Sequence, residues 1–222
     1  MSERRRIGFS LYLITDRRLM KVPLYEGIEA ALRGGVRAVQ LREKDLSVKD
    51  LYRAACRLRS LTSRHGARLF VNDRLDVAIA AGADGVHLGG KSIPLRAVRK
   101  VAGKGMLVGV STHSLEEAID AERDGADFIT FGPVYETPSK MRYGPPAGIE
   151  KLREVTSRVK IPVFAIGGVQ PARVQDVARA GAGGVALISA VLSSDDIERA
   201  AARLTASVER ALTEPPSSCS RP

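Results

Sequence analysis

Cysteine, histidine and aromatic residues are scarce in this chain of 222 residues. It has two cysteines, three histidines and no tryptophan, and aromatic residues make up 5% of the sequence. The two cysteines, Cys56 and Cys219, are too few for a disulfide framework or a cysteine-ligated metal centre. Three histidines also argue against a metal centre built from several imidazoles. The composition therefore favours a fold held by its own hydrophobic core.

Long apolar runs are also missing. No stretch of about 18 consecutive apolar residues occurs, so we expect no membrane span. The chain begins Met-Ser-Glu-Arg-Arg-Arg-Ile, which is unlike the apolar core of a secretory signal peptide. We therefore expect a cytoplasmic protein that does not bind a membrane.

The charge is unbalanced toward basic residues. Thirty-five Lys and Arg against 25 Asp and Glu leave a net charge of +10, which favours an anionic partner. Many of the basic residues fall in helical segments, such as Arg53, Arg57, Arg96 and Arg99, where they are typical of solvated outer faces. A nucleic-acid surface would need a basic stripe with exposed aromatic residues. We therefore expect small anionic substrates and no nucleic acid.

Short apolar runs alternate with segments of helical periodicity along the whole chain. Segments such as Val48–Leu61, Leu115–Arg123 and Val174–Ala180 have the helical period. This alternation is typical of parallel strands joined by crossover helices, and continuous apolar runs are typical of a sheet that helices cover. The predicted strands are Leu11–Thr15, Ala38–Arg42, Arg68–Asn72, Gly85–Leu88, Met106–Val110, Phe128–Gly132, Pro162–Ile166 and Gly184–Ile188.

A glycine junction that ends a helix and opens a strand recurs four times, beginning at Gly34, Gly82, Gly125 and Gly181. Glycine supplies the left-handed turn after a helix. The three intervals between these junctions each hold two strand–helix units. Four such double units make eight strands, which predicts a single (β/α)₈ TIM barrel. An open doubly wound sheet is the alternative, but the chain has no G-x-G-x-x-G run. We expect the barrel over residues 10–212, a short arm over 1–9, and a disordered Pro/Ser-rich tail over 213–222.

In such a barrel the chemistry lies where the strands end. Gln40, Arg42 and Lys44 alternate along one strand end and are predicted to face the same side. A polar, cationic trio inside a barrel is costly unless it meets an anion. The alternative is that Arg42 pairs with a carboxylate, such as Glu43 or Asp73.

Glycines near the last two strands predict a second anion site. Gly167-Gly168 and Ile188-Ser189 each precede a helix, and backbone N–H groups at such positions bind phosphate in many barrels. The alternative is that the glycines only permit tight turns. The first zone, cationic with a carboxylate, suits a diphosphate with Mg²⁺, whereas the second suits a monophosphate.

Six fragments in order give the chain a resemblance to a known family: Leu11–Asp16, Gln40–Asp45, Val71–Arg74, Gly109–His113, Phe131–Val134 and Ala165–Gly168. From about residue 11 to residue 205 the chain resembles thiamine phosphate synthase. Members of that family are (β/α)₈ barrels that join hydroxymethylpyrimidine diphosphate to hydroxyethylthiazole phosphate and require Mg²⁺. The products are thiamine monophosphate and pyrophosphate, formed through a pyrimidine-methyl cation.

The resemblance implies a role for each matching residue. The pyrimidine diphosphate is held by Gln40, Arg42, Lys44, Asn72, Ser111 and Lys140, of which Arg42, Lys44, Ser111 and Lys140 are the catalytic set. The thiazole phosphate is held by Thr137, Ser139, Gly168, Ile188 and Ser189, and Mg²⁺ is bound by Asp73. Homo-oligomers are compatible with the sequence, which does not decide the oligomeric state.

The chain departs from the family pattern after its fourth strand. The family has a second Mg²⁺-binding carboxylate where this chain has Ser92, whose neutral hydroxyl is a poorer ligand for a hard cation. This change resembles the related thiazole tautomerase, but that relative has a histidine where this chain has Pro133. A non-catalytic barrel that binds a thiamine precursor is a third hypothesis. We expect His113 to lie in the pocket wall and His87 to be a core residue.

Overall fold

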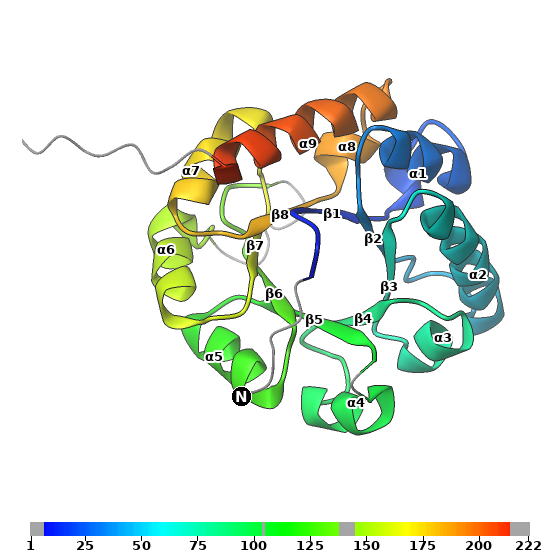
Figure 1. Ribbon diagram of the computed structural model, residues 1–222, viewed down its shortest axis with the longest axis horizontal. Helices are drawn as coiled ribbons and strands as arrows, with labels where there is room; N and C mark the ends of the chain where they lie inside the picture. The colour runs from blue at the N-terminus through cyan, green and yellow to red at the C-terminus, as the bar shows by residue number, and fades with distance from the viewer. Residues whose placement is uncertain (1–6, 104, 138–144, 214–222) are drawn as a thin grey trace, which may run out of the picture.

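The computed structural model describes residues 7–103, 105–137 and 145–213. Its eight parallel strands close into a barrel in chain order, each paired with the next and β8 paired with β1. The helices surround the strands in an outer ring (Figure 1). The prediction of a single (β/α)₈ barrel is confirmed. The strands are β1 (Leu11–Ile14), β2 (Ala38–Leu41), β3 (Arg68–Asn72), β4 (Gly85–Leu88), β5 (Leu107–Thr112), β6 (Phe128–Phe131), β7 (Val163–Ile166) and β8 (Gly184–Leu187).

The helices lie between the strands as the periodicity predicts. Side-chain caps begin two of them, because the hydroxyls of Ser47 and Ser114 accept hydrogen bonds from backbone N–H groups in the first turns of α2 and α5. The α-helices are α1 (Leu24–Arg33), α2 (Val48–Arg64), α3 (Leu75–Ala80), α4 (Leu95–Ala102), α5 (Leu115–Asp124), α6 (Gly148–Arg158), α7 (Val174–Arg179), α8 (Ser189–Leu192) and α9 (Ile197–Thr213). Short 3₁₀ helices are η1 (Arg17–Leu19) and η3 (Pro171–Arg173).

The repeated glycine junctions have the predicted left-handed backbone. Gly35, Gly82, Gly125 and Gly181 have φ values of 96°, 62°, 98° and 86°. At the first junction the second glycine takes this role. Gly34 instead permits close packing, since a Cβ atom there would collide with the Glu198 carbonyl of α9. Each junction therefore turns the chain from an outer helix back into the barrel.

Aromatic rings fill the barrel near the beginnings of its strands. Tyr12, Phe70, Phe128 and Phe164 are fully buried, and the ring centroid of Phe9 lies 5.3–5.7 Å from those of all four. We expected residues 1–9 to form an arm outside the barrel, but Ile7 is buried and Phe9 packs inside the barrel, so these two side chains belong to the core. The segment before β1 runs into the centre of the ring of strands (Figure 1). Residues 1–6 and 214–222, the remainder of the expected arm and tail, lie outside the described residues.

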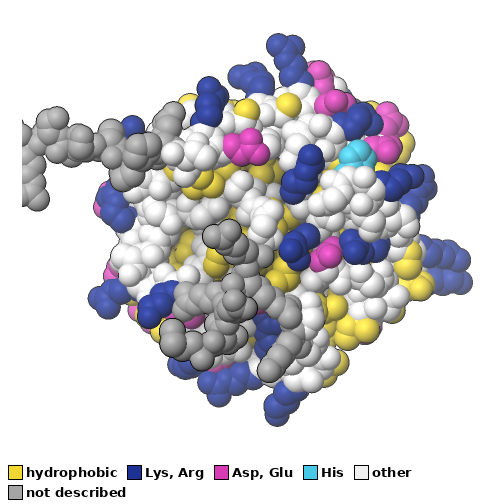
Figure 2. All heavy atoms as spheres, viewed as in Figure 1, with side chains coloured by type: hydrophobic (Ala, Val, Ile, Leu, Met, Phe, Trp, Pro, Cys, Tyr) yellow, Lys and Arg dark blue, Asp and Glu magenta, His cyan; other side chains and the backbone are white. Residues whose placement is uncertain are grey.

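The outer surface carries much of the basic excess in paired form. Arg96 pairs with Asp124 at 2.8 Å and Arg53 with Asp50 at 3.4 Å, both across exposed helix faces. Figure 2 shows Lys and Arg side chains spread around the rim of one face, without a single dense patch. The interpretation of the helical arginines as solvated outer faces is confirmed for these two pairs. Within the described ranges, no helix has the length and apolar character needed to cross a bilayer.

Candidate functional site

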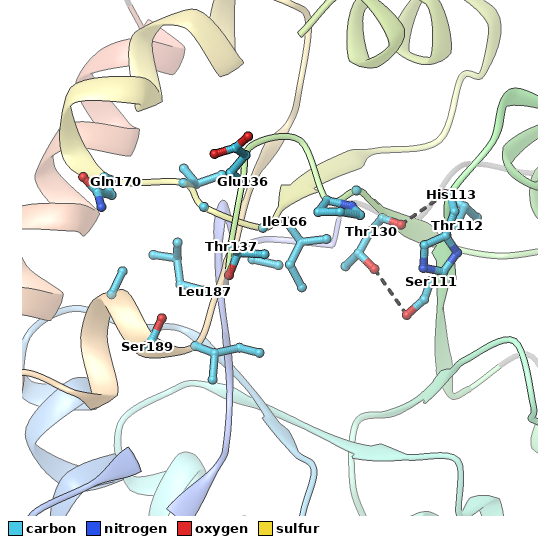
Figure 3. Close-up of a pocket in the computed structure, with 18 of the residues that line it drawn as sticks. Ser111, Thr112, His113, Thr130, Glu136, Thr137, Ile166, Gln170, Leu187 and Ser189 are labelled. Carbon is cyan, nitrogen blue, oxygen red and sulfur yellow. Dashed lines mark hydrogen bonds between the residues drawn. The ribbon is translucent and has the colours of Figure 1, made fainter. Parts of the chain in front are cut away.

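A cavity of about 540 Å³ lies at the carboxyl ends of β5 to β8 (Figure 3). This volume falls within the range of about 300–1,000 Å³ that is typical of small-molecule sites. Ile166, Leu187 and Ile188 give it apolar walls, and hydroxyls from β5, β6 and the start of α8 face it. Five residues that the sequence analysis assigned to the site line this cavity: Ser111, Thr137, Gly168, Ile188 and Ser189.

The turn after β7 is joined to the loop after β6. The backbone N–H of Val134 donates to the Ile166 carbonyl at 2.9 Å, and that of Tyr135 to the Gly167 carbonyl at 3.0 Å. Gly168 has a φ of 65°, and a Cβ atom there would lie 2.5 Å from the Glu136 carbonyl oxygen. Gly168 is therefore required both by its backbone conformation and by the close approach of the neighbouring loop.

Arg173 orients one peptide group at this turn. Its guanidinium donates to the Gly168 carbonyl at 2.7 Å and lies over the Tyr135 ring, 4.4 Å from the centroid. Because a trans peptide directs its C=O and N–H in opposite directions, the N–H of Val169 points away from Arg173. Gly168, Val169 and Ser189 all line the cavity, and Ser189 begins α8, where backbone N–H groups lack intrahelical acceptors. The arrangement supplies backbone donors for an anion.

A buried hydrogen-bond chain connects the two sides of the barrel. Gln40 Nε2 donates to the Tyr12 hydroxyl at 3.1 Å, and that hydroxyl lies 3.4 Å from His87 Nδ1. His87 Nε2 lies 3.0 Å from Ser111 Oγ, to which Thr130 Oγ1 donates at 3.4 Å (Figure 3). Burial lowers the pKa of His87 to about 3, with Asp73 opposing the shift and Arg42 adding to it. Gln40 and Ser111, predicted at one subsite, are thus physically linked.

The cationic zone lies at the ends of β1 and β2. Arg42 is half-buried and Lys44 exposed. Glu43 is 5% exposed and pairs with Arg17, whose Nη1 lies 2.8 Å from Glu43 Oε2, and Arg17 also pairs with Asp45 at 2.6 Å. These two carboxylates raise the pKa of Arg17. Within the described residues, Arg42 has no ion pair with Glu43 or Asp73, so that alternative is wrong.

Asp73 is held between the loops that follow β3 and β4. Asn72 Nδ2 donates to Asp73 Oδ2 at 2.7 Å, and Ser92 Oγ donates to Asp73 Oδ1. The Gly89 N–H donates to Ser92 Oγ at 2.7 Å. Asp73 has a φ of 61°, an uncommon conformation outside glycine. In the described part of the chain, no three His, Cys, Asp or Glu residues come together as a metal-binding group, so Asp73 does not belong to a three-ligand cluster.

Some site residues lie beyond the sequence predictions or outside the described ranges. Lys140 and Ser139 lie outside the described residues. Tyr12 was not predicted, and His87 was taken only as a core residue, although a histidine within an apolar strand is a signal of a buried polar contact. Thr130, Glu136 and Gln170 also line the cavity. His113 lies in the cavity wall as expected, with its Nδ1 3.3 Å from the Glu117 carboxylate.

Known proteins that resemble this chain in sequence and fold share one family name. The model of the family described as thiamine monophosphate synthase matches residues 11–191. A Geobacter sulfurreducens protein named putative thiamine-phosphate synthase is 53% identical over 201 residues, 90% of this chain and 94% of that protein. Thiamine-phosphate synthase of Chloroflexus aurantiacus is 44% identical over 91% of this chain and 94% of its own length. The structure of thiamine phosphate pyrophosphorylase from Pyrococcus furiosus has a TM-score of 0.85 and 40% identity, covering 91% of this chain and 96% of that one. The chain belongs to the thiamine monophosphate synthase family.

Proposed function

We propose that this protein joins hydroxymethylpyrimidine diphosphate to hydroxyethylthiazole phosphate, giving thiamine monophosphate and pyrophosphate. One observation carries the proposal: a single barrel mouth has a cationic zone at β2 and a cavity with backbone donors at β7 and β8. The buried chain from Gln40 to Ser111 connects them. Two phosphorylated substrates held in one mouth are placed for transfer between them.

The cationic zone is assigned to the diphosphate. The bond between the pyrimidine methylene carbon and the diphosphate oxygen breaks with its electron pair going to the diphosphate, and the thiazole nitrogen then forms the new C–N bond. Arg42 and Lys44, together with Lys140, would stabilise the charge that grows on the leaving group. Arg17 already neutralises the buried Glu43, so Glu43 does not pair with Arg42. The Arg42 guanidinium therefore stays available for the diphosphate, which supports this role.

The cavity is assigned to the thiazole phosphate. Its phosphate would accept hydrogen bonds from backbone N–H groups near Gly168 and Ser189 and from the hydroxyls of Thr137, Ser139 and Ser189. The apolar walls formed by Ile166 and Ile188 would exclude water, which would otherwise trap the pyrimidine cation. Pro133 also lines this cavity and has no titratable group, which favours coupling over the proton transfer of a tautomerase.

The donor set at Asp73 fits a magnesium ion. Mg²⁺ is usually held by one or two carboxylates together with substrate phosphate oxygens and water. Asp73 Oδ1 accepts from Ser92 Oγ and, at 3.4 Å, from the Gly89 N–H. Asp73 Oδ2 accepts from Asn72 and keeps a lone pair for the ion. A bound Mg²⁺ would neutralise charge on the leaving diphosphate. Asp73 would hold the ion and Ser92 would orient Asp73.

Formation of thiamine monophosphate from both substrates, with Mg²⁺ titrated and an EDTA control, tests the proposal. We expect product only with the metal, and an Asp73→Asn variant that needs more Mg²⁺. Absence of product at every Mg²⁺ concentration would overturn the proposal; thiazole isomerisation would then indicate a tautomerase and binding without turnover a non-catalytic barrel. Cytoplasmic location and a homo-oligomer stay predictions.

A further inference from the structure

We infer that Tyr12 and His87 are positioning residues that leave the Ser111 hydroxyl able only to donate a hydrogen bond to its ligand. This inference deepens the proposed function, because it states what chemistry the diphosphate subsite accepts beside Ser111. The residues come from β1, β4 and β5, and all lie at the level where the barrel interior meets its mouth.

The first hydrogen bond, between Gln40 and Tyr12, sets which atoms donate and which accept along the buried hydrogen-bond chain. Gln40 is 1% exposed, and its amide nitrogen, which can only donate, lies 3.1 Å from the Tyr12 oxygen. The Tyr12 oxygen therefore accepts from Gln40, and its own hydrogen is directed to His87 Nδ1 at 3.4 Å. His87 Nδ1 is thereby an acceptor.

The imidazole transmits this direction to Ser111. His87 is 2% exposed, and its two ring nitrogens face the hydroxyls of Tyr12 and Ser111 and not a carboxylate. A charged imidazole would be buried there without a counter-ion, so the ring is neutral and one nitrogen carries the single hydrogen. Since Nδ1 accepts, that hydrogen is on Nε2, which donates to Ser111 Oγ at 3.0 Å. The ring packs against Tyr12 and Phe128, with centroids 5.6 and 5.8 Å away, which holds it in place.

The hydroxyl hydrogen of Ser111 is the one polar group of this side chain that the buried hydrogen-bond chain does not use. Its oxygen accepts from His87 Nε2 and from Thr130 Oγ1, which occupies both lone pairs. Its own O–H is the remaining group, and Ser111 lines the cavity. The subsite therefore selects a ligand atom that accepts, such as a phosphoryl oxygen, and rejects an N–H donor at this position.

The tautomer of His87 can be measured without turnover. In protein labelled with ¹⁵N-histidine, we expect His87 to be neutral at neutral pH, with hydrogen on Nε2 and none on Nδ1. The chain has three histidines, so His65→Gln and His113→Gln variants assign the signals. A Tyr12→Phe variant should lose the preference for Nε2–H. An Nδ1–H tautomer or an imidazolium in the unmodified protein would overturn the inference.

Ligand binding and turnover form a second arm. For Tyr12→Phe we expect a loss of about tenfold in kcat and in affinity for inorganic pyrophosphate with Mg²⁺, less than the factor of about 10²–10³ for deleting a donor outright. The KM for the thiazole phosphate should not change. Thr62→Val is the matched control, because it removes a buried hydroxyl of α2 that bonds only the Arg59 carbonyl. Unchanged pyrophosphate affinity and kcat in Tyr12→Phe would overturn the inference, whereas failure of the proposed function alone would leave the tautomer as predicted.

Discussion

Buried polar side chains concentrate near the mouth of the barrel. Of the described residues, the buried polar or charged ones are Thr15, Gln40, Glu43, Thr62, His87, Thr112 and Thr130. All but Thr62 lie in or just after a strand of the barrel. Each of the seven has a hydrogen-bond partner in the described structure, because the only orphaned buried side-chain atom found there is Thr205 Oγ1. Most of the buried polar side chains therefore lie near the candidate site and are not distributed through the core.

His87 makes the stability of the protein depend on pH. An unfolded histidine has a pKa of about 6.5, whereas burial lowers the pKa of His87 to about 3. As the pH falls below about 6.5, the unfolded chain binds a proton that the folded chain does not, so the free energy of unfolding falls by up to roughly 1.4 kcal/mol per pH unit until about pH 3. Urea unfolding of the wild type and of His87→Gln should give a flatter pH profile for the variant.

The control for this profile is His113→Gln, which removes a half-exposed histidine from the cavity wall. It should keep the slope of the wild type. An equal slope in His87→Gln and the wild type would show that the acid sensitivity comes from other groups, such as the carboxylates.

We predict that Ser92 limits the metal affinity of the site proposed at Asp73. Its hydroxyl donates to Asp73 Oδ1, so the described site offers one carboxylate and one neutral oxygen. Ser92→Asp adds a second carboxylate beside the first, and we expect Mn²⁺ to bind at least about tenfold tighter in the absence of diphosphate. Calorimetric titration with Mn²⁺ measures this. Ser92→Asn, similar in size but neutral, is the control, and equal affinity of the two variants would contradict a metal position at Asp73.

At the scale of single elements, the strands were predictable because each is an apolar run, and β2 to β8 also follow the end of a helix, often with a glycine. β3 and β4 begin and end at the predicted residues. β5 extends two residues beyond its prediction, because Ser111 and Thr112 pair with Thr130 and Phe131 of β6. An apolar-run criterion ends a strand where its side chains become polar, and this is where a barrel begins its site.

Contacts between elements were not predictable from the same patterns. The pairing of Val134 with Ile166 and the contact of Arg173 with Tyr135 join separate loops, and local periodicity has no information about such partners. The strand-end rule placed Gln40 and Ser111 at the site, whereas the chain through Tyr12 and His87 follows from the register of several strands. The sequence could predict which side chains lie at the carboxyl ends of the strands, but only the structure shows their hydrogen-bond partners.

The turn after β7 provides a test at the element scale. Gly168→Ala introduces a Cβ atom 2.5 Å from the Glu136 carbonyl oxygen, so the turn and the neighbouring loop must separate. We expect the KM for the thiazole phosphate to rise by about tenfold or more, since the backbone donors move with the turn. Steady-state kinetics with each substrate varied in turn measures this effect.

Gly66→Ala is the matched control. Gly66 has a φ of 61°, close to the 65° of Gly168, but a Cβ atom there would meet nothing within 4 Å. Because alanine disfavours a positive φ, both substitutions should lower the free energy of unfolding by a similar amount, about 1 kcal/mol. Only Gly168→Ala also disturbs the site. A normal KM in Gly168→Ala would remove this turn from the thiazole phosphate pocket.

At the scale of the whole molecule, the barrel interior is layered. Aromatic rings fill the end where the strands begin, the hydrogen-bond chain lies above them, and the cavity opens at the other end. Tyr12 belongs to both lower layers, because its ring packs on Phe70 and Phe128 while its hydroxyl joins the chain. This division is general in the fold, where one end serves stability and the other activity.

Phe9 tests whether the two ends are independent. The Phe9 ring contacts four aromatic residues at the end of the barrel where the strands begin. Phe9 itself is half-buried. For Phe9→Ala we expect the free energy of unfolding to fall by about 2–4 kcal/mol, toward the lower part of the range for buried aromatic residues. The kcat should stay within about twofold of the wild type at a temperature where the variant is folded, because the rings and not the mouth are disturbed.

Urea unfolding and steady-state kinetics on one preparation measure both quantities. Tyr52→Ala, which removes an exposed ring from α2, is the control for losing an aromatic side chain. Unchanged stability would mean that the segment before β1 does not close the barrel, and a large loss of kcat in the folded variant would mean that the aromatic layer also positions the chain above it.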